Sequence, residues 1–292
     1  MMRFGCCGNL IATGADKTGM EFIGEIASLG FDYVELPLAE MTALSEDDFH
    51  RLEDIVKESG IVCEACNNFF PASVRLTGPE VDAGKIESYL ESALTRAQVL
   101  GVSVIVFGSG GAKRVPQGFP YEKAYDQLLD VTQRISALTL PLGITIALEP
   151  MRRPDCNILN TFAVSVDFAR QLNCSNVKVL IDYYHMKCEK ESPDVLLQYG
   201  REYLAHVHFS NPSIPCLNGK KDPEAISQIF EDELSRRGWW RTFPAENDGE
   251  DYSRFIANLK TIGYTGRVSL EAPVKQFAEE AKAALQLLRD RF

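Results

Sequence analysis

The stretch AGKIESYLESALTRAQVLGVSVIVF, residues 83–107, contains the unit from which the fold is predicted. Apolar residues recur at three- and four-residue spacing over 83–100, which is typical of a helix with one buried stripe. Gly101 follows, where a left-handed helix C-cap is expected, and the apolar run Val104–Phe107 has the length of a short buried strand. The stretch therefore predicts a helix, a glycine cap and a strand in succession.

Similar units recur along the chain, and Gly30 and Gly60 end two of the other helical segments. Short apolar runs alternate with amphipathic segments, which favours βα units and a parallel sheet. The expected strands are Arg3–Cys7, Tyr33–Leu36, Ile61–Cys66, Val104–Phe107, Ile144–Leu148, Val177–Ile181, Leu204–Phe209 and Arg267–Leu270. The expected helices are Glu21–Leu29, Asp47–Glu58, Ala83–Leu100, Tyr121–Leu138, Phe162–Leu172, Ala225–Arg237, Tyr252–Ile262 and Phe277–Leu288. Eight strands predict an α/β protein with a single (β/α)8 TIM barrel, as one domain over residues 1–292.

Composition narrows the classes of partner. The chain has 292 residues, of which 45% are hydrophobic and 24% charged, enough to bury one large core. A formal net charge of -11 disfavours nucleic acid and anionic membranes as main partners. No window approaches the roughly 18 apolar residues of a membrane span, so a cytoplasmic location is expected. A homo-oligomer is compatible with these features.

The cysteines are predicted to be reduced thiols. Eight are scattered along the chain, unlike the dense framework of a small secreted domain. Cys63 and Cys66 form a C-x-x-C motif inside an expected strand. Since residues three apart on a regular strand point to opposite faces, we expect the two sulfurs to diverge.

Four consecutive expected strands end in residues that commonly bind metals. Active sites of such barrels lie at the carboxyl ends of the strands, where neighbouring strand ends converge. A single charged residue there often only meets solvent, but three carboxylates so close would repel unless a cation neutralised them. One imidazole with three carboxylates suits manganese or magnesium, with cobalt and zinc as alternatives. The predicted ligands are Glu149, Asp182, His208 and Glu271.

The motifs around these residues resemble those of the xylose isomerase-like barrels of sugar isomerases and epimerases, particularly the ketose 3-epimerases. The resemblance covers nearly the whole chain. The matching pieces are Glu149 followed by Asp155 and Asn160, Asp182-Tyr-Tyr-His185-Met186, His206-Val-His208, the segment 244–251, and Gly263-Tyr-Thr-Gly-Arg-Val-Ser-Leu-Glu271.

The resemblance implies one divalent ion on the four ligands, with Glu149 and Glu271 moving the proton and His185 contacting substrate oxygens. Asp155 stands where the epimerases usually carry a glutamate that helps fix the substrate. The epimerases also place an arginine shortly after the histidine of the seventh strand, whereas here Asn211-Pro-Ser-Ile-Pro follows. These two departures leave the exact substrate and reaction open.

The predicted chemistry is removal and return of a proton on a carbon next to a carbonyl. A bound metal would stabilise the enediolate electrostatically, with the two glutamates as the acid/base pair. Return on the opposite face is epimerisation, and transfer to the neighbouring carbon is aldose-ketose isomerisation of the hydroxypyruvate type or similar. A keto-inositol type dehydratase would begin with the same step. A sugar-binding barrel without catalysis and an endonuclease IV-like hydrolase are more remote; the hydrolase would need more than the four histidines present.

Several other residues are secondary candidates. Glu35 and Asn67 are predicted to contact substrate hydroxyls, with a supporting position behind the site as the alternative. His206 is expected inside the barrel, one layer below the strand end. The loop Gly108–Gly111 with Lys113 and Arg114 could cradle a phosphate. The expected partner is accordingly a small sugar or sugar phosphate.

Overall fold

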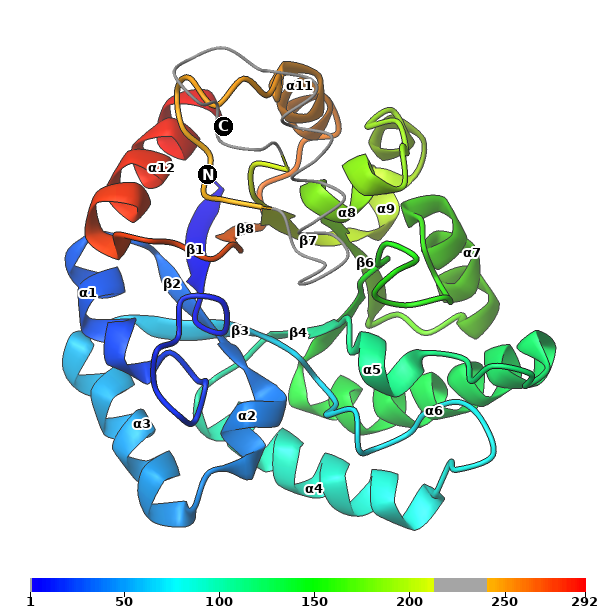
Figure 1. Cartoon of the computed structure of the whole chain (residues 1–292). Helices are drawn as coiled ribbons and strands as arrows, with labels where there is room; N and C mark the ends of the chain where they lie inside the picture. Colours follow the sequence, from blue (N-terminus) through cyan, green and yellow to red (C-terminus); the bar gives the residue numbers. More distant parts are fainter. Residues whose placement is uncertain (1, 213–240) are drawn as a thin grey trace.

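The computed structural model describes residues 2–212 and 241–292. Eight parallel strands close into a barrel in sequence order, with β1 paired to β8 (Figure 1). This confirms the predicted TIM barrel, and the expected strand bounds are met within about a residue. The strands are β1 (Arg3–Cys7), β2 (Tyr33–Pro37), β3 (Val62–Asn67), β4 (Val104–Phe107), β5 (Thr145–Leu148), β6 (Val177–Asp182), β7 (Leu204–Phe209) and β8 (Arg267–Leu270).

Helices surround the barrel, and the longer ones coincide with predicted segments (Figure 1). Gly30, Gly60 and Gly101 have the left-handed φ values expected after helices, 88°, 72° and 75°. The predicted helix Ala225–Arg237 lies outside the described residues. The longer helices are α1 (Ile23–Ser28), α3 (Glu46–Ser59), α4 (Ala83–Val99), α6 (Tyr121–Thr139), α7 (Phe162–Leu172), α11 (Ser253–Thr261) and α12 (Phe277–Arg291).

Several shorter helices were not predicted from the sequence. They are mostly a single turn, too short to give a periodic apolar pattern. None of the helices in 2–212 and 241–292 is long and apolar enough to cross a membrane. The short elements are η1 (Met20–Phe22), α2 (Leu38–Ala43), α5 (Gly110–Lys113), η2 (Leu140–Leu142), α8 (Tyr183–Cys188), η3 (Leu196–Gly200) and α9 (Arg201–Tyr203).

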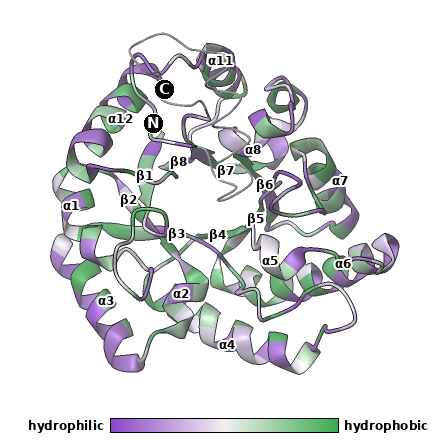
Figure 2. Cartoon of the chain, in the orientation of Figure 1, coloured by the Kyte–Doolittle hydropathy of each residue, from purple (hydrophilic) through white to green (hydrophobic). Residues whose placement is uncertain are grey.

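The apolar core has two parts. The larger part fills the space between the strands and the surrounding helices. Figure 2 shows its basis, since the strands are drawn mainly in green and the helices alternate green with purple. The smaller part lies inside the barrel and consists of Tyr33, Ala65, Val104, Val106, Ala147 and Leu180. Between this small apolar layer and the carboxyl ends of the strands, the interior of the barrel becomes polar. This polarity is the first indication that a functional site lies at the carboxyl end of the barrel.

Strand β3 contains an irregularity that corrects one prediction. Its register with β2 shifts so that Val34 pairs with Cys63 but Glu35 pairs with Ala65, which leaves Glu64 as an extra residue. Cys63 and Cys66 consequently both belong to the outer core. Burial and the neighbouring Cys63 raise the pKa of Cys66 well above its ordinary value. The prediction that the two sulfurs diverge was wrong, because the extra residue interrupts the alternation of the strand.

The amino-terminal end of the barrel is held by paired charges. Glu64 forms ion pairs with Arg3 and Arg267, which begin β1 and β8. Arg267 Nη2 also donates to Ser103 Oγ at 2.9 Å. Here one carboxylate lies between two guanidinium groups, so its charge is compensated.

Candidate metal centre

The carboxyl ends of β5, β6, β7 and β8 bring the four predicted ligands together. One potential ligand atom from each lies within 4.8 Å of the others, and all four residues are buried. We call this set the ligand cluster, and it consists of Glu149, Asp182, His208 and Glu271. The sequence spacing thus led to residues that share one site, although they come from four different strands.

Two local features place the first two carboxylates. A Cβ on Gly108 would lie 2.0 Å from Glu149 Oε2, so only glycine leaves room for this side chain beside β4. Asp182 ends β6 and is also the N-cap of α8, where its Oδ1 accepts from Tyr184 N at 2.7 Å. The cap fixes the carboxylate, and Oδ2 remains directed towards the cluster.

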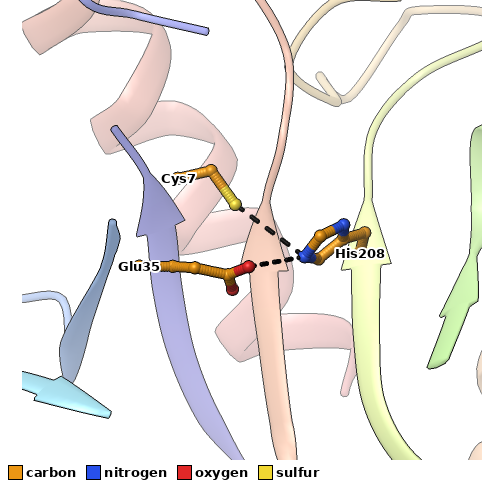
Figure 3. Close-up of side chains that lie close together, drawn as sticks. All are labelled: Cys7, Glu35 and His208. Atoms are coloured by element: carbon orange, nitrogen blue, oxygen red, sulfur yellow. Dashed lines mark hydrogen bonds and ion pairs between the residues drawn. The ribbon is translucent and has the colours of Figure 1, made fainter. Parts of the chain in front are cut away.

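His208 presents one nitrogen to the cluster and the other to the barrel interior. Its Nδ1 lies 3.0 Å from Glu271 Oε2 and 3.4 Å from Glu149 Oε1. Its Nε2 lies 2.8 Å from Glu35 Oε1 (Figure 3). Within the described residues, Nδ1 of His208 is buried without a hydrogen bond. Buried polar atoms in native proteins usually have a hydrogen-bond or metal partner. A ring nitrogen beside three carboxylates is a ligand set that suits a divalent cation.

Arg241 also reaches the cluster, which the sequence analysis did not predict. Its Nη1 lies 2.7 Å from Asp182 Oδ2 and 2.9 Å from Glu271 Oε2, and its guanidinium carbon is 5.0 Å from the centre of the Tyr184 ring. An antiparallel bridge between Asn211 and Thr242 brings this segment beside the end of β7. An arginine thus lies beside the end of β7, although in the sequence it follows His208 by 33 residues.

The charges in the cluster oppose one another. Burial alone would raise the pKa of Glu271, but the charge of Arg241 and the neighbouring ring of His208 outweigh this effect and hold the pKa below its ordinary value. Burial raises the pKa of Asp182, and Arg241 offsets this only in part. Among the described residues, one guanidinium and the ring of His208 face three carboxylates, so the site retains an attraction for a further cation.

A cavity of about 680 Å³ opens above the cluster. Glu149, Glu271 and Arg241 line its floor, together with His185 from α8 and Asp155 from the loop after β5. Burial lowers the pKa of His185 to about 4, so its imidazole is neutral at pH 7 and offers one donor and one acceptor.

The carboxylate of Asp155 is held in place by the guanidinium of Arg152. Its carboxylate accepts from Arg152 Nε at 2.7 Å and from Arg152 Nη2 at 3.0 Å, and its Oδ2 lies 4.0 Å from His185 Nδ1. Arg152 itself is nearly fully buried. The structure thus brings Asp155 and His185 to the same wall of the cavity.

Glu35 and Asn67 do not line this cavity. Glu35 is fully buried and contacts the inner side of His208 and also His206. Asn67 donates to Asn9 Oδ1 at 3.1 Å. Their places fit the supporting position weighed as the alternative to a substrate contact, and His206 lies inside the barrel as expected.

The loop after β4 lines the cavity with Gly110 and Gly111, but its two cations do not face the cavity as the phosphate cradle considered from the sequence would require. Lys113 is fully buried and donates to the backbone oxygens of Phe107 at 2.8 Å and Glu149 at 3.4 Å. Arg114 donates to the backbone oxygen of Pro154. Both cations are therefore used in holding loops together, and neither lines the cavity.

Comparison with known proteins agrees with this geometry. A D-psicose 3-epimerase of Ruminiclostridium cellulolyticum is 26% identical over 194 residues, which is 64% of this chain and 64% of that relative. This match spans less than two thirds of the relative's length. A ketose 3-epimerase of Arthrobacter globiformis is 25% identical over 281 residues, 93% of this chain and 83% of that one.

Solved structures share the fold. The crystal structure of a D-allulose 3-epimerase from Methylomonas sp. in complex with D-allulose superposes with a TM-score of 0.79 at 19% identity, covering 100% of this chain and 97% of the other. The family model described as xylose isomerase-like TIM barrel matches residues 23–291. With the barrel and the strand-end cluster in place, this match shows that the chain belongs to the xylose isomerase-like TIM barrel family.

Proposed function

We propose that this chain is a divalent-metal-dependent sugar epimerase that acts on a ketose at carbon 3. The observation that carries the proposal is the ligand cluster, in which two buried glutamates that line an open cavity meet a histidine and an aspartate. Manganese is the expected ion, since the set offers mostly oxygen with one nitrogen, and magnesium, cobalt and zinc remain alternatives. A bound ion would supply positive charge where negative charge develops on the substrate oxygens.

The two glutamates have separate tasks in this proposal. Glu149 follows β5 and Glu271 follows β8, with β6 and β7 between them, so the carboxylates approach a substrate from two sides. One takes the proton from the carbon and the other gives a proton back on the opposite face, which inverts that carbon. Their second oxygens remain as ligand atoms for the ion.

The remaining polar groups orient the sugar. The neutral imidazole of His185 can hydrogen-bond a hydroxyl, and its position on the cavity wall beside Asp155 suits this task. Arg241 lies at the floor and can donate to a carbonyl or hydroxyl oxygen next to the reacting carbon. The cavity contains both polar groups and apolar wall residues such as Phe70 and Met151, as expected for a sugar with one hydrophobic face.

The names of the relatives support the substrate class. D-psicose 3-epimerase and ketose 3-epimerase both denote inversion next to a ketone. Activity on a free sugar is favoured over a sugar phosphate because Lys113 and Arg114 are bound to backbone oxygens. The cytoplasmic location, the absence of nucleic acid partners, the single domain and a homo-oligomeric state stay predictions.

A screen of the Mn²⁺-loaded protein against free and phosphorylated ketoses in deuterated water tests the proposal. We expect a C3 epimer that carries one deuterium, formed only with a divalent ion present. A product lighter by one water would instead identify a dehydratase, and an aldose product an aldose-ketose isomerase. A purified protein that turns over its substrate without any bound ion, and is insensitive to chelator, would contradict the metal site.

A further inference from the structure

The carboxylate of Glu35 lies on the inner side of the ligand cluster, where the proposed function has no task for it. Glu35 extends from β2 across the interior to β7, and Figure 3 shows it with Cys7 facing the ring of His208. One oxygen, Oε1, lies 2.8 Å from Nε2 of His208. The other oxygen, Oε2, lies 2.8 Å from Nε2 of His206 and accepts from Ser269 Oγ at 2.5 Å. Each carboxylate oxygen of Glu35 thus contacts a different histidine.

A chain of contacts holds this carboxylate in place. Tyr33 OH lies 2.7 Å from Ser269 Oγ, and Ser269 in turn donates to Glu35. The Tyr33 ring fits beneath because Gly5 on β1 has no side chain, and a Cβ there would lie 2.3 Å from the ring. Glu35, His206 and Ser269 all have an exposed fraction of 0%. The group is therefore rigid and dry, conditions under which a hydrogen bond determines which nitrogen of a histidine carries the proton.

We infer that Glu35 is a positioning residue that fixes His208 with its proton on Nε2 and its lone pair on Nδ1, directed at the ion. A histidine that binds a metal through one nitrogen commonly donates the other N–H to a carboxylate, which sets both the tautomer and the orientation of the ring. Here the two nitrogens of His208 face in opposite senses, Nε2 towards Glu35 and Nδ1 towards Glu149 and Glu271. The inference rests on the metal site of the proposed function.

Cys7 offers a competing arrangement. Its sulfur lies 4.0 Å from His208 Nε2, and with Glu35 and His208 it forms a second group that has metal-ligating atoms. An ion there would have to replace the proton on Nε2, and the 2.8 Å separation from Glu35 is that of a hydrogen bond. The geometry therefore favours a proton between Glu35 and His208.

The decisive measurement is the protonation of the His208 ring in the wild-type protein. The chain has four histidines, so ¹⁵N spectra of the Mg²⁺-loaded protein, which is diamagnetic, are simple enough to assign by single substitutions. We expect a proton on Nε2 and none on Nδ1 of His208. A proton on Nδ1 in the loaded protein would overturn the inference without any variant having to fold.

Metal affinity then tests the role of Glu35 by titration of the ion-free protein with Mn²⁺. Glu35→Ala should weaken binding by about 10- to 100-fold, as is typical when a supporting carboxylate is lost. Glu35→Gln should lose less, because its carbonyl oxygen can still accept from Nε2–H. Glu64→Gln is the matched control, since Glu64 is a half-buried carboxylate of the neighbouring strand at the opposite end of the barrel, and it should bind as the wild type does.

Three outcomes separate the hypotheses. Equal affinity of the wild type and both Glu35 variants would refute the positioning role while leaving the metal site intact. A wild type that binds no ion would refute the metal site itself. Two ions per chain, one of them lost in Cys7→Ala, would show that Nε2 carries a metal and not a proton, and would also overturn the inference.

Discussion

The two ends of the barrel treat buried charge in opposite ways. At the amino-terminal end, Glu64 lies between Arg3 and Arg267, so one carboxylate has two cationic partners. At the carboxyl end, three carboxylates share Arg241 and the ring of His208. In the first arrangement the carboxylate is fully compensated, whereas in the second the carboxylates outnumber the cationic groups of residues 2–212 and 241–292. In such barrels one end serves stability and the other serves chemistry, and the charge balance identifies which is which.

The largest effect is expected for the two glutamates of the functional end. In Glu149→Gln and Glu271→Gln the amide oxygen can still reach an ion, but an amide cannot take up and return a proton at neutral pH. Turnover should fall by about 10² to 10⁴-fold in each variant. Epimer formation and substrate deuterium exchange are measured together. One variant should exchange without forming epimer, and near-normal turnover in both would refute the division of labour.

The next largest effect concerns the ion itself. Asp182→Asn keeps an oxygen that can cap α8, so the fold should survive while the charged ligand is lost, and His208→Ala removes the nitrogen donor. Both should weaken metal binding by more than the roughly 100-fold that supporting residues control. Metal content is compared with circular dichroism of the same samples. Full occupancy in both variants would mean that other residues hold the ion.

Arg241 sharpens the comparison because, in the part of the chain that the structure describes, its guanidinium forms ion pairs with two of the three carboxylates. Arg241→Met should bind the divalent ion more tightly, since a like charge is removed from beside Asp182 and Glu271. The same variant should bind the sugar more weakly, with a KM raised by about 10-fold or more, because a charged hydrogen-bond donor is lost. Metal titration and steady-state kinetics measure the two shifts. Weaker ion binding would show that Arg241 supports the ligands and does not compete with the ion.

The smallest effect on activity is expected at the structural end. Arg267→Gln removes a partner of Glu64 and the donor to Ser103, and should lower the free energy of unfolding by roughly 1–3 kcal/mol. The value of kcat should be unchanged, since this residue begins β8 and the active end lies beyond its other terminus. Chemical denaturation and kinetics on the same preparation provide the check. A large loss of kcat with unaltered stability would remove the distinction between the two ends.

Much of the fold could be predicted from the sequence, because the sequence patterns that define its strands and helices are local. The strands are short apolar runs, and the helix that begins at Ala83 ends at Val99, two residues before Gly101. Residues close together in the sequence therefore define each element. The ligand cluster could also be predicted, because each member lies at the end of a strand and the order of strands in the barrel makes these four strand ends adjacent. A helix start could have been read at Asp182, whose side chain caps the next turn.

The remainder depends on contacts between distant residues. Arg241 reaches the site through a bridge from Thr242 to Asn211, which no local pattern indicates. Glu35 lies on β2 and contacts two histidines of β7. The position of Glu35 in the sequence could not distinguish this contact inside the barrel from the predicted contact with a substrate. The shared side of Cys63 and Cys66 follows from a register shift that depends on the partner strand.

The closure of β1 on β8 has a consequence for when the metal centre can exist during biosynthesis. Glu271 directly follows β8, the last strand of the barrel to be synthesised, whereas Glu35, which contacts His208, belongs to β2. A nascent chain that ends before β8 has neither the fourth ligand nor the closed interior that orients the third. The proposed metal centre can therefore be completed only after β8 has been synthesised, so binding of an ion would be coupled to the closing of the barrel.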